Sequence, residues 1–156
     1  MSQPINITAA TEADLPALCA LLHELFTIEQ DFAPDAQRQA AGLRMLLGCP
    51  QRCQVLVARH DSAGVVGMVS GQLVFSSAEG ALSAWVEDLV VAAPFRRLGL
   101  GGRLLSRITA WARDRGATRA QLLVDDQNHS AEAFYGAGGW RRTRLRAMQL
   151  PLRPPV

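Results

Sequence analysis

The chain has no lysine, because all 16 of its basic residues are arginine. This absence excludes Schiff-base catalysis, lysine nucleophiles and the Walker-type phosphate loop, whose lysine reaches the terminal phosphates. Cysteine is scarce too. Only Cys19, Cys49 and Cys53 occur, and this odd number with a single C-x₃-C spacing argues against both a disulfide framework and a zinc site. We therefore expect a reduced, cytoplasmic protein without a metal.

Long apolar runs are also missing. The N-terminus has no apolar signal core, and the longest weakly polar stretch, residues 63–75, is broken by Ser70 and Gln72. We expect neither a membrane span nor a membrane partner. What is present suits one globular domain, since the 156 residues are 49% apolar and 19% charged and contain no internal repeat. We predict a single domain over residues 1–156.

Charge is divided unevenly along the chain. Residues 1–95 carry ten acids and four arginines, whereas residues 96–156 carry four acids and twelve arginines. An acidic half suits a cationic ligand and a basic half suits phosphates, although the same charges also solvate an ordinary surface. The arginines between Arg141 and Arg146 lack interleaved aromatic residues, so we expect no nucleic-acid partner.

Hydrophobic periodicity changes several times along the chain and predicts alternating helices and strands. Thr11, with Asp14 three residues later, predicts the start of the first helix. Asp35 is predicted to cap the second helix, which ends at Gly48. The predicted strands are Ile5–Ala9, one beginning at Cys53, Val65–Phe75, Leu82–Ala92, Ala120–Val124 and Trp140–Leu150, and the later helices cover residues 104–112 and 130–137. We predict an α+β fold, with a mixed, mostly antiparallel sheet and helices on both faces.

A glycine-rich loop, Arg96-Arg97-Leu98-Gly99-Leu100-Gly101-Gly102, joins a predicted strand to a predicted helix. Backbone N–H groups at a helix N-terminus favour a pyrophosphate, although such glycines also serve conformation alone. The dinucleotide-binding spacing G-x-G-x-x-G fails here, because a motif that begins at Gly99 needs glycine where Leu104 stands.

Three separated segments resemble the GCN5-related N-acetyltransferase (GNAT) family. They are the strand Trp85-Val86-Glu87-Asp88-Leu89-Val90-Val91, the loop Arg96-x-x-Gly-x-Gly, and Asn128 followed by Ala133-Phe134-Tyr135 and a Gly-Trp pair. The match holds in order and spacing over residues 81–140, while the N-terminal helices agree only in pattern. The resemblance implies an acyl-CoA N-acyltransferase fold and acetyl transfer from acetyl-CoA to the primary amine of a small molecule by direct attack.

The resemblance also implies where acetyl-CoA binds. In the family, two neighbouring strands part and the pantetheine arm slots between them like an added strand. For this chain, the resemblance implies that the pantetheine forms hydrogen bonds with the backbone of Leu89, Val90 and Val91. The pyrophosphate would lie in the loop of Arg96, Arg97, Leu98, Gly99, Leu100, Gly101 and Gly102, with Asn128 and Ala131 closing the other side.

Two residues are predicted to move protons. Tyr135 matches the family's general acid, because a phenol with a pKa of about 10 can protonate a departing thiolate. Strict alternation places Trp85, Glu87 and Leu89 on one face of the strand and Val86 and Asp88 on the other. Glu87 then faces the thioester, either as a base or as an anchor for a cationic substrate.

The acceptor pocket is predicted between the first two helices, where family members often build it. Glu29, Asp31 and Asp35 could attract an ammonium group, with Phe26 and Phe32 as apolar walls. Trp85 is a further predicted substrate contact, and acids beside a helix start also serve as caps. The alternative to an enzyme is a catalytically inactive CoA-binding or regulatory module of the same fold. The last strand has little after it, so we expect a second subunit to complete the acceptor site and predict a homodimer.

Overall fold

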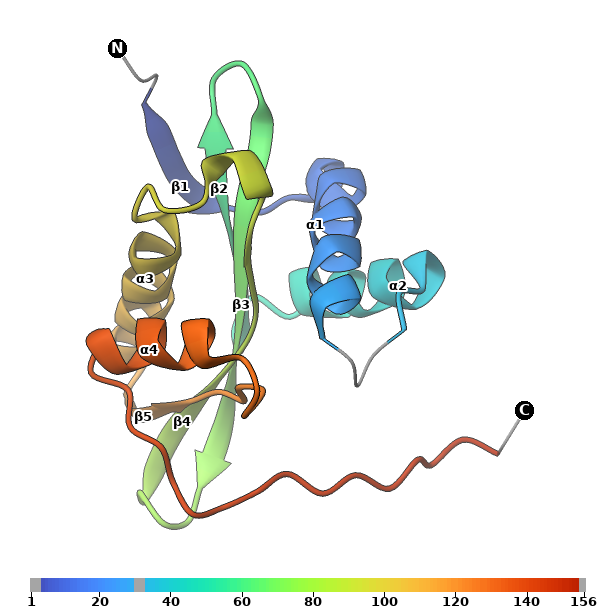
Figure 1. Ribbon diagram of the computed structural model, residues 1–156. Coiled ribbons are helices and arrows are strands. Elements are labelled where there is room, and N and C mark those ends of the chain that lie inside the picture. Colours follow the sequence, from blue (N-terminus) through green and yellow to red (C-terminus); the bar gives the residue numbers. More distant parts are fainter. Residues whose placement is uncertain (1–3, 30–32, 155–156) are drawn as a thin grey trace. The chain divides into compact units, whose positions relative to one another are not determined.

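The computed structural model describes residues 4–29 and 33–154. The chain divides into two units, Met1–Leu122 and Leu123–Val156. The first unit contains the sheet and the helices α1, α2 and α3, and the second contains α4 (Figure 1). No helix within the described ranges is long and apolar enough to cross a membrane.

A five-stranded sheet with the strand order β1-β2-β3-β4-β5 forms the centre of the first unit (Figure 1). Its first four strands pair antiparallel, and β5 pairs parallel to β4. This mixed, mostly antiparallel sheet confirms the predicted fold class. The strands are β1 (Ile5–Ala9), β2 (Cys53–His60), β3 (Gly64–Ser76), β4 (Ala81–Val91) and β5 (Ala117–Gln121).

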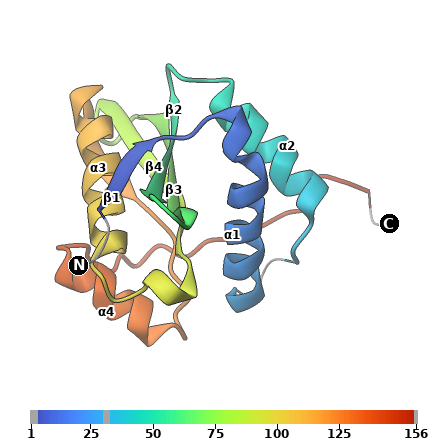
Figure 2. The ribbon, with the colours of Figure 1, turned by 90° about the horizontal axis from the view of Figure 1, so that it is seen from above.

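Helices cover both faces of this sheet, as predicted. Helices α1 (Leu15–Ile28) and α2 (Ala36–Leu47) lie on one face, and α3 (Leu100–Asp114) lies on the other (Figure 2). Leucines of α1 and α2 pack with Val55, Val57 and Met68 of the sheet to form one buried cluster. The apolar stripe of α3 follows the helical period, with buried Leu100, Leu104, Leu105, Ile108 and Ala112.

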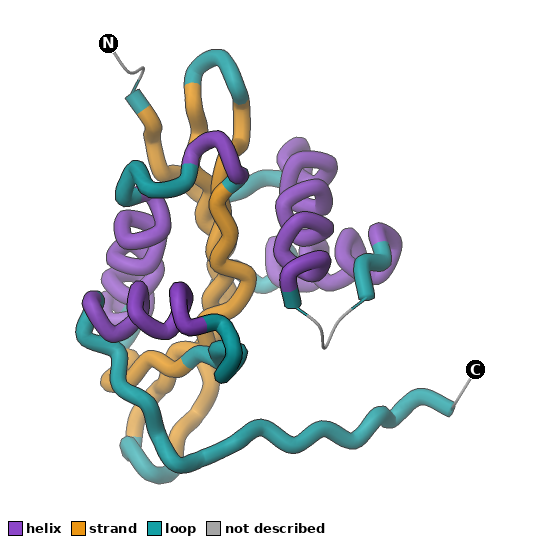
Figure 3. The backbone as a smooth tube through the Cα atoms, in the orientation of Figure 1, coloured by secondary structure: helices purple, strands orange, loops and turns teal. Residues whose placement is uncertain are grey.

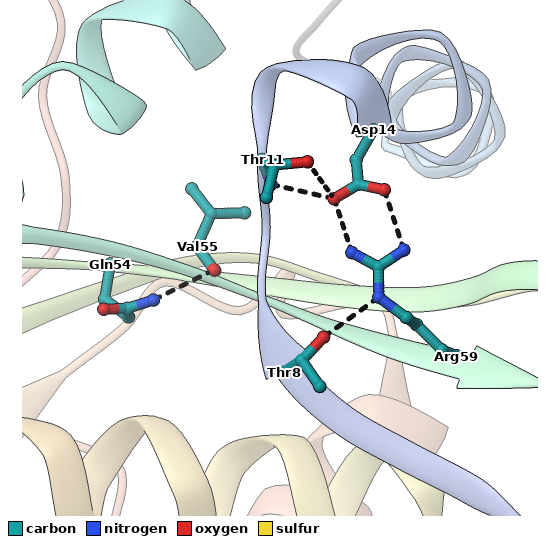
Figure 4. Close-up of polar contacts among 6 residues, drawn as sticks. All are labelled: Thr8, Thr11, Asp14, Gln54, Val55 and Arg59. Atoms are coloured by element: carbon teal, nitrogen blue, oxygen red, sulfur yellow. Dashed lines mark hydrogen bonds and ion pairs between the residues drawn. The ribbon is translucent and has the colours of Figure 1, made fainter.

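The start of α1 is fixed by a polar network. The Thr11 amide donates to the Asp14 carboxylate at 2.8 Å, and Arg59 of β2 donates to both oxygens of that carboxylate at 2.8 and 2.7 Å (Figure 4). Asp14 is buried, and the Arg59 guanidinium lowers its pKa, more than burial raises it. Arg59 also donates to the Thr8 hydroxyl at 3.0 Å, so one side chain ties β1, β2 and α1 together.

Two predicted strands differ in the structure. The strand predicted over Ala120–Val124 lies earlier, because β5 pairs with Leu82–Trp85 of β4 and ends at Gln121. The strand predicted over Trp140–Leu150 is wrong, since these residues form no strand and Figure 3 draws them as loop. Their alternating apolar side chains remain exposed. A strand needs a neighbouring edge, and among the described residues no strand pairs with this segment.

Candidate active site

The last part of β4 has one open edge. Pairing between β4 and β5 ends at Trp85 and Gln121, whereas β4 continues to Val91. On its other side this part of β4 still pairs with β3. Within the described residues, the β5-facing N–H and C=O groups of residues 86–91 therefore have no strand partner. The predicted pantetheine contacts, Leu89, Val90 and Val91, lie on this stretch.

A β-bulge interrupts β4 within the same stretch. Ser70 of β3 pairs with Glu87 and Met68 pairs with Val90, so the single residue Val69 faces two residues of β4. Asp88 adopts a left-handed backbone conformation with φ of 56°. The strict alternation assumed from the sequence is therefore wrong here, because an extra residue shifts every later side chain to the other face.

The bulge brings Asp88 to the same face as Glu87. The Ser70 hydroxyl donates to the Asp88 carboxylate at 3.0 Å and lies 3.2 Å from the Glu87 carbonyl oxygen. Since Ser70 pairs with Glu87 across the strands, their side chains share a face. Asp88, which alternation had placed on the opposite face, joins them there.

The pKa of Asp88 is raised to about 6, and burial is the largest cause. The neighbouring Glu87 carboxylate and, to a smaller extent, Glu29 at the end of α1 also raise it, while the Ser70 hydrogen bond opposes the rise. A carboxyl group with this pKa is suited to take up a proton near neutral pH. The site thus gathers three acids from two elements.

Glu87 itself is exposed and already has a partner. Its carboxylate accepts a hydrogen bond from the indole N–H of Trp85, two residues earlier on the same face of β4. This contact fixes the direction of the Glu87 side chain and leaves its second oxygen for another donor. Trp85 and Glu87, which the sequence places together, do lie together.

The glycine loop after β4 fits an anionic group. Within the described part of the chain, no acceptor is bonded to the amides of residues 97–102. The loop turns through left-handed residues, with φ of 62° at Arg97 and 75° at Gly99, and α3 begins at Leu100. A Cβ atom added at Gly99 or Gly102 would meet nothing within 4 Å. Free amides, open space and the positive end of a helix dipole suit the pyrophosphate of acetyl-CoA.

Arg96, a predicted contact of the pyrophosphate, has two partners within the chain. Its guanidinium forms an ion pair with Glu24 of α1 at 2.6 Å and donates to the Val91 carbonyl at 2.8 Å. Glu24 also accepts from the Ala93 amide at 3.2 Å. Arg96 therefore fixes the loop to α1 and to the end of β4.

The second unit holds the remaining predicted residues. Asn128 caps α4 (His129–Ala137), with its side-chain oxygen accepting from the Ala131 amide at 3.0 Å. Tyr135 lies on α4, and its ring centroid is 5.2 Å from that of Phe134 and 6.1 Å from that of Trp140.

The acceptor residues predicted between α1 and α2 divide into three cases. Glu29 follows the last residue of α1, and its charge contributes to the raised pKa of Asp88. Asp31 and Phe32 lie outside the described residues. Asp35 caps α2, because its carboxylate accepts from the Arg38 amide at 3.1 Å.

Sequence reasoning missed Asp88 and Ser70. The Glu-Asp pair was visible, but a bulge in a strand leaves no periodic mark in a stretch as apolar as this one. The available signal was Ser70 itself, a hydroxyl within the apolar run of β3, because a buried hydroxyl needs a hydrogen-bond partner.

Comparisons with known proteins agree with this geometry. The Acetyltransferase (GNAT) family model matches residues 16–139. The aminoalkylphosphonate N-acetyltransferase of Salmonella typhimurium is 28% identical over 88% of this chain and 85% of its own. The thialysine N-epsilon-acetyltransferase of Caenorhabditis elegans is 39% identical over 35% of this chain and 38% of its own.

The fold is also similar to that of solved acetyltransferases. The crystal structure of a possible acetyltransferase from Clostridium difficile superposes with a TM-score of 0.83, at 18% identity, and covers 96% of this chain and 99% of that one. Because the family match spans the parted strands, the glycine loop and α4, the chain belongs to the acetyltransferase (GNAT) family and is an acetyl-CoA-dependent acyltransferase.

Proposed function

We propose that this protein transfers the acetyl group of acetyl-CoA to the primary amine of a small molecule by direct attack. The carboxyl groups of Glu29, Glu87 and Asp88 carry the proposal. Glu87 and Asp88 lie on the stretch of β4 with the open edge, the charge of Glu29 acts on Asp88, and an ammonium group is the natural partner for such acids. Acetyl-CoA supplies the acetyl group as a thioester.

Backbone groups of this chain would hold acetyl-CoA. The open edge of β4 at Leu89, Val90 and Val91 would pair with the pantetheine arm, and the amides of residues 97–102 would bind the pyrophosphate. Asn128 and Ala131 already bond to each other across the first turn of α4, so their contribution is to present that helix terminus.

Asp88 is the better proton acceptor of the two neighbouring acids. An amine must lose a proton before it attacks, and an ammonium has a pKa of about 10. The raised pKa of Asp88, about 6, leaves a gap of about four units, against about six for an ordinary carboxyl group. Glu87 is exposed and oriented by Trp85, which suits an anchor for the incoming ammonium.

Tyr135 is proposed to protonate the departing thiolate of CoA. It is the only tyrosine of the chain, and it lies on the helix that Asn128 caps. A phenol with a pKa of about 10 can supply a proton to a thiolate whose thiol has a pKa of about 8.5, at a small cost in driving force.

The names of two relatives support an amine acceptor, since one is an aminoalkylphosphonate N-acetyltransferase and the other a thialysine N-epsilon-acetyltransferase. The acids of this site add a preference. A diamine places a second cation among the carboxylates, whereas an aminoalkylphosphonate brings an anion toward them. We therefore expect diamines to be the better acceptors here.

A thiol-release assay tests the proposal. The purified chain would be given acetyl-CoA and a panel of diamines, amino acids, aminoalkylphosphonates and alcohols, with calorimetry of CoA binding alongside. We expect release of CoA that depends on an amine, and N-acetylated product by mass spectrometry. Tight CoA binding without turnover on any amine would contradict the proposal and favour a CoA-binding module.

The homodimer is a separate proposal. Leu145, Met148 and Leu150 are each at least 81% exposed, and apolar side chains gathered on one segment favour an interface. Sedimentation of the full chain, with and without Met148→Ser and Leu150→Ser, would measure the association. The cytoplasmic location remains a prediction from the cysteine content.

A further inference from the structure

A closed turn joins α2 to β2 and holds a cysteine at each end. The amide of Arg52 donates to the Cys49 carbonyl at 3.1 Å, and the amide of Cys53 donates to the same oxygen at 2.8 Å. Pro50 occupies the second position of this turn, where its fixed φ is favourable. The bond from the Cys53 amide closes an α-turn, a single helical turn in which the Cα atoms of residues i and i+4 are about 6 Å apart, within the range that a disulfide requires.

The two thiols are also near each other. Both cysteines are free and partly exposed, and the Cys49 side chain is within hydrogen-bonding reach of Cys53. Burial raises the pKa of Cys53, the hydrogen bond with Cys49 and the charge of Cys49 raise it further, and the nearby Arg52 guanidinium opposes the rise. The turn is anchored to the sheet, because the Leu73 amide of β3 donates to the Arg52 carbonyl at 2.8 Å.

We propose that Cys49 and Cys53 form a dithiol site, which a low-molecular-weight disulfide such as oxidised glutathione converts into an intramolecular disulfide. The Cys49 thiolate attacks one glutathione sulfur, and a mixed disulfide forms as one glutathione thiolate leaves. The Cys53 thiolate then attacks the Cys49 sulfur, and the second glutathione thiolate leaves. Two protein thiols are oxidised to the disulfide, and oxidised glutathione takes up their two electrons and two protons and leaves as two glutathione thiols.

Attack by Cys49 is written as the first step, and first attack by Cys53 gives the same disulfide. Once the mixed disulfide has formed, the turn keeps Cys53 beside it, and the second step is intramolecular. A lone cysteine has no such second step, and its reaction ends at the mixed disulfide.

Cys19 supplies an internal control. It lies on α1, packs against the buried cluster there and is partly exposed. Burial raises its pKa, and the Arg44 guanidinium opposes the rise. Cys19 therefore reports how readily a single, partly buried thiol of this fold reacts with the same reagent.

The test uses the full chain, reduced and then incubated with oxidised glutathione, quenched by alkylation and mapped by mass spectrometry. We expect a peptide joining Cys49 to Cys53, with Cys19 either alkylated or carrying one glutathione, so that at most one of the three thiols stays free. In Cys53→Ser, glutathione should remain on Cys49. In Cys19→Ser, the disulfide should still form.

A second probe, phenylarsine oxide, binds two thiols at once through its trivalent arsenic. One equivalent should protect both Cys49 and Cys53 from alkylation in the Cys19→Ser chain, and should protect neither in Cys49→Ser or Cys53→Ser. The proposal is overturned if the pair collects two glutathiones without closing, if it stays reduced while Cys19 is glutathionylated, or if protection is equal in all variants.

Discussion

The Ser70 hydroxyl donates a hydrogen bond of 3.0 Å to the Asp88 carboxylate and so joins a buried position of β3 to the bulge of β4. The backbone of Asp88 is left-handed, and this contact holds its side chain on the face that Glu87 occupies. Strained residues persist where their surroundings fix them, and such positions are frequent at functional sites. Asp88 is accordingly the residue on which the proposed proton transfer depends.

Asp88→Asn should lower kcat/KM for an amine about 100-fold or more while leaving CoA affinity unchanged, because the amide cannot accept the proton. In the unchanged chain the carboxylate is the active form, so activity should fall as the pH drops through about 6. Steady-state kinetics against pH measure both effects. Asp114 is an exposed residue at the end of α3, so Asp114→Asn is the matched control. Equal losses in the two variants would contradict the role of Asp88.

The raised pKa of Asp88 also predicts how stability depends on pH. As the pH falls, activity should decrease whereas stability should increase. A carboxyl group whose pKa is higher in the folded protein than in the unfolded chain destabilises the fold when charged. Stability from this group is therefore gained as the pH falls through about 6. The gain in Tm on replacing Asp88 by Asn should be larger at pH 8 than at pH 5.

Ser70→Ala should move the acid limb of the activity profile to higher pH. The Ser70 hydrogen bond lowers the pKa of Asp88, so its loss removes the interaction that opposes burial. Ser83, another buried serine, lies on β4 and accepts from Arg119, so Ser83→Ala is the control. A limb that stays in place in both variants would show that Asp88 does not set it.

Gly102→Leu should weaken CoA binding at least about 10-fold, a loss of about 1.4 kcal/mol, without lowering Tm. A side chain at Gly102 meets no atom of the chain within 4 Å, so it fills space that the proposal gives to the pyrophosphate. Gly42 of α2 is equally open and lies far along the chain from the loop, which makes Gly42→Leu the control. Calorimetry of both variants provides the comparison.

Tyr135→Phe should lower kcat about 100-fold with CoA affinity unchanged, since the variant lacks only the proton to be donated. Because Tyr135 is the only tyrosine, ultraviolet titration of the whole protein reports its pKa directly. That titration should shift when CoA binds. Full activity in Tyr135→Phe would remove this residue from the mechanism.

Asp14→Asn should cost about 2 kcal/mol of the free energy of unfolding, because the amide breaks a buried, bidentate contact with Arg59. The pKa of Asp14 is lowered, so the pair stabilises the fold above pH 4 and the stabilisation is lost as the pH falls below it. Urea unfolding at pH 7 and pH 3 should show the difference shrinking. Glu12→Gln, which breaks the exposed pair with Arg44, should cost about 0.5 kcal/mol or less.

Local patterns were enough to predict most of this fold. Asp35 caps α2 as its position suggests, and the alternation in β2 and the stripe of α3 give the correct faces. Interactions between distant segments were not visible in the same way. The end of β5 depends on its register with Leu82–Trp85, and the bulge at Asp88 depends on how β3 and β4 pair. The strand predicted over Trp140–Leu150 failed for the same reason, since alternation shows a possible face but not a partner.

The candidate site divides along the same line. The glycine loop and Trp85-Glu87 could be read from spacing, because their parts lie close together in the sequence. The ion pair of Arg96 could not be predicted from spacing, because its partner Glu24 lies on α1, more than 70 residues away. The pairing of Asp88 with Ser70 likewise joins two strands.

Amide hydrogen exchange with and without CoA tests the central claim most directly, namely that the unpaired edge of β4 and the loop after it hold this ligand through their main chain. We predict slower exchange at Leu89–Val91 and at residues 97–102 in the presence of CoA, with β1 unchanged. Saturating CoA that leaves both segments exchanging as in the free protein would contradict the account.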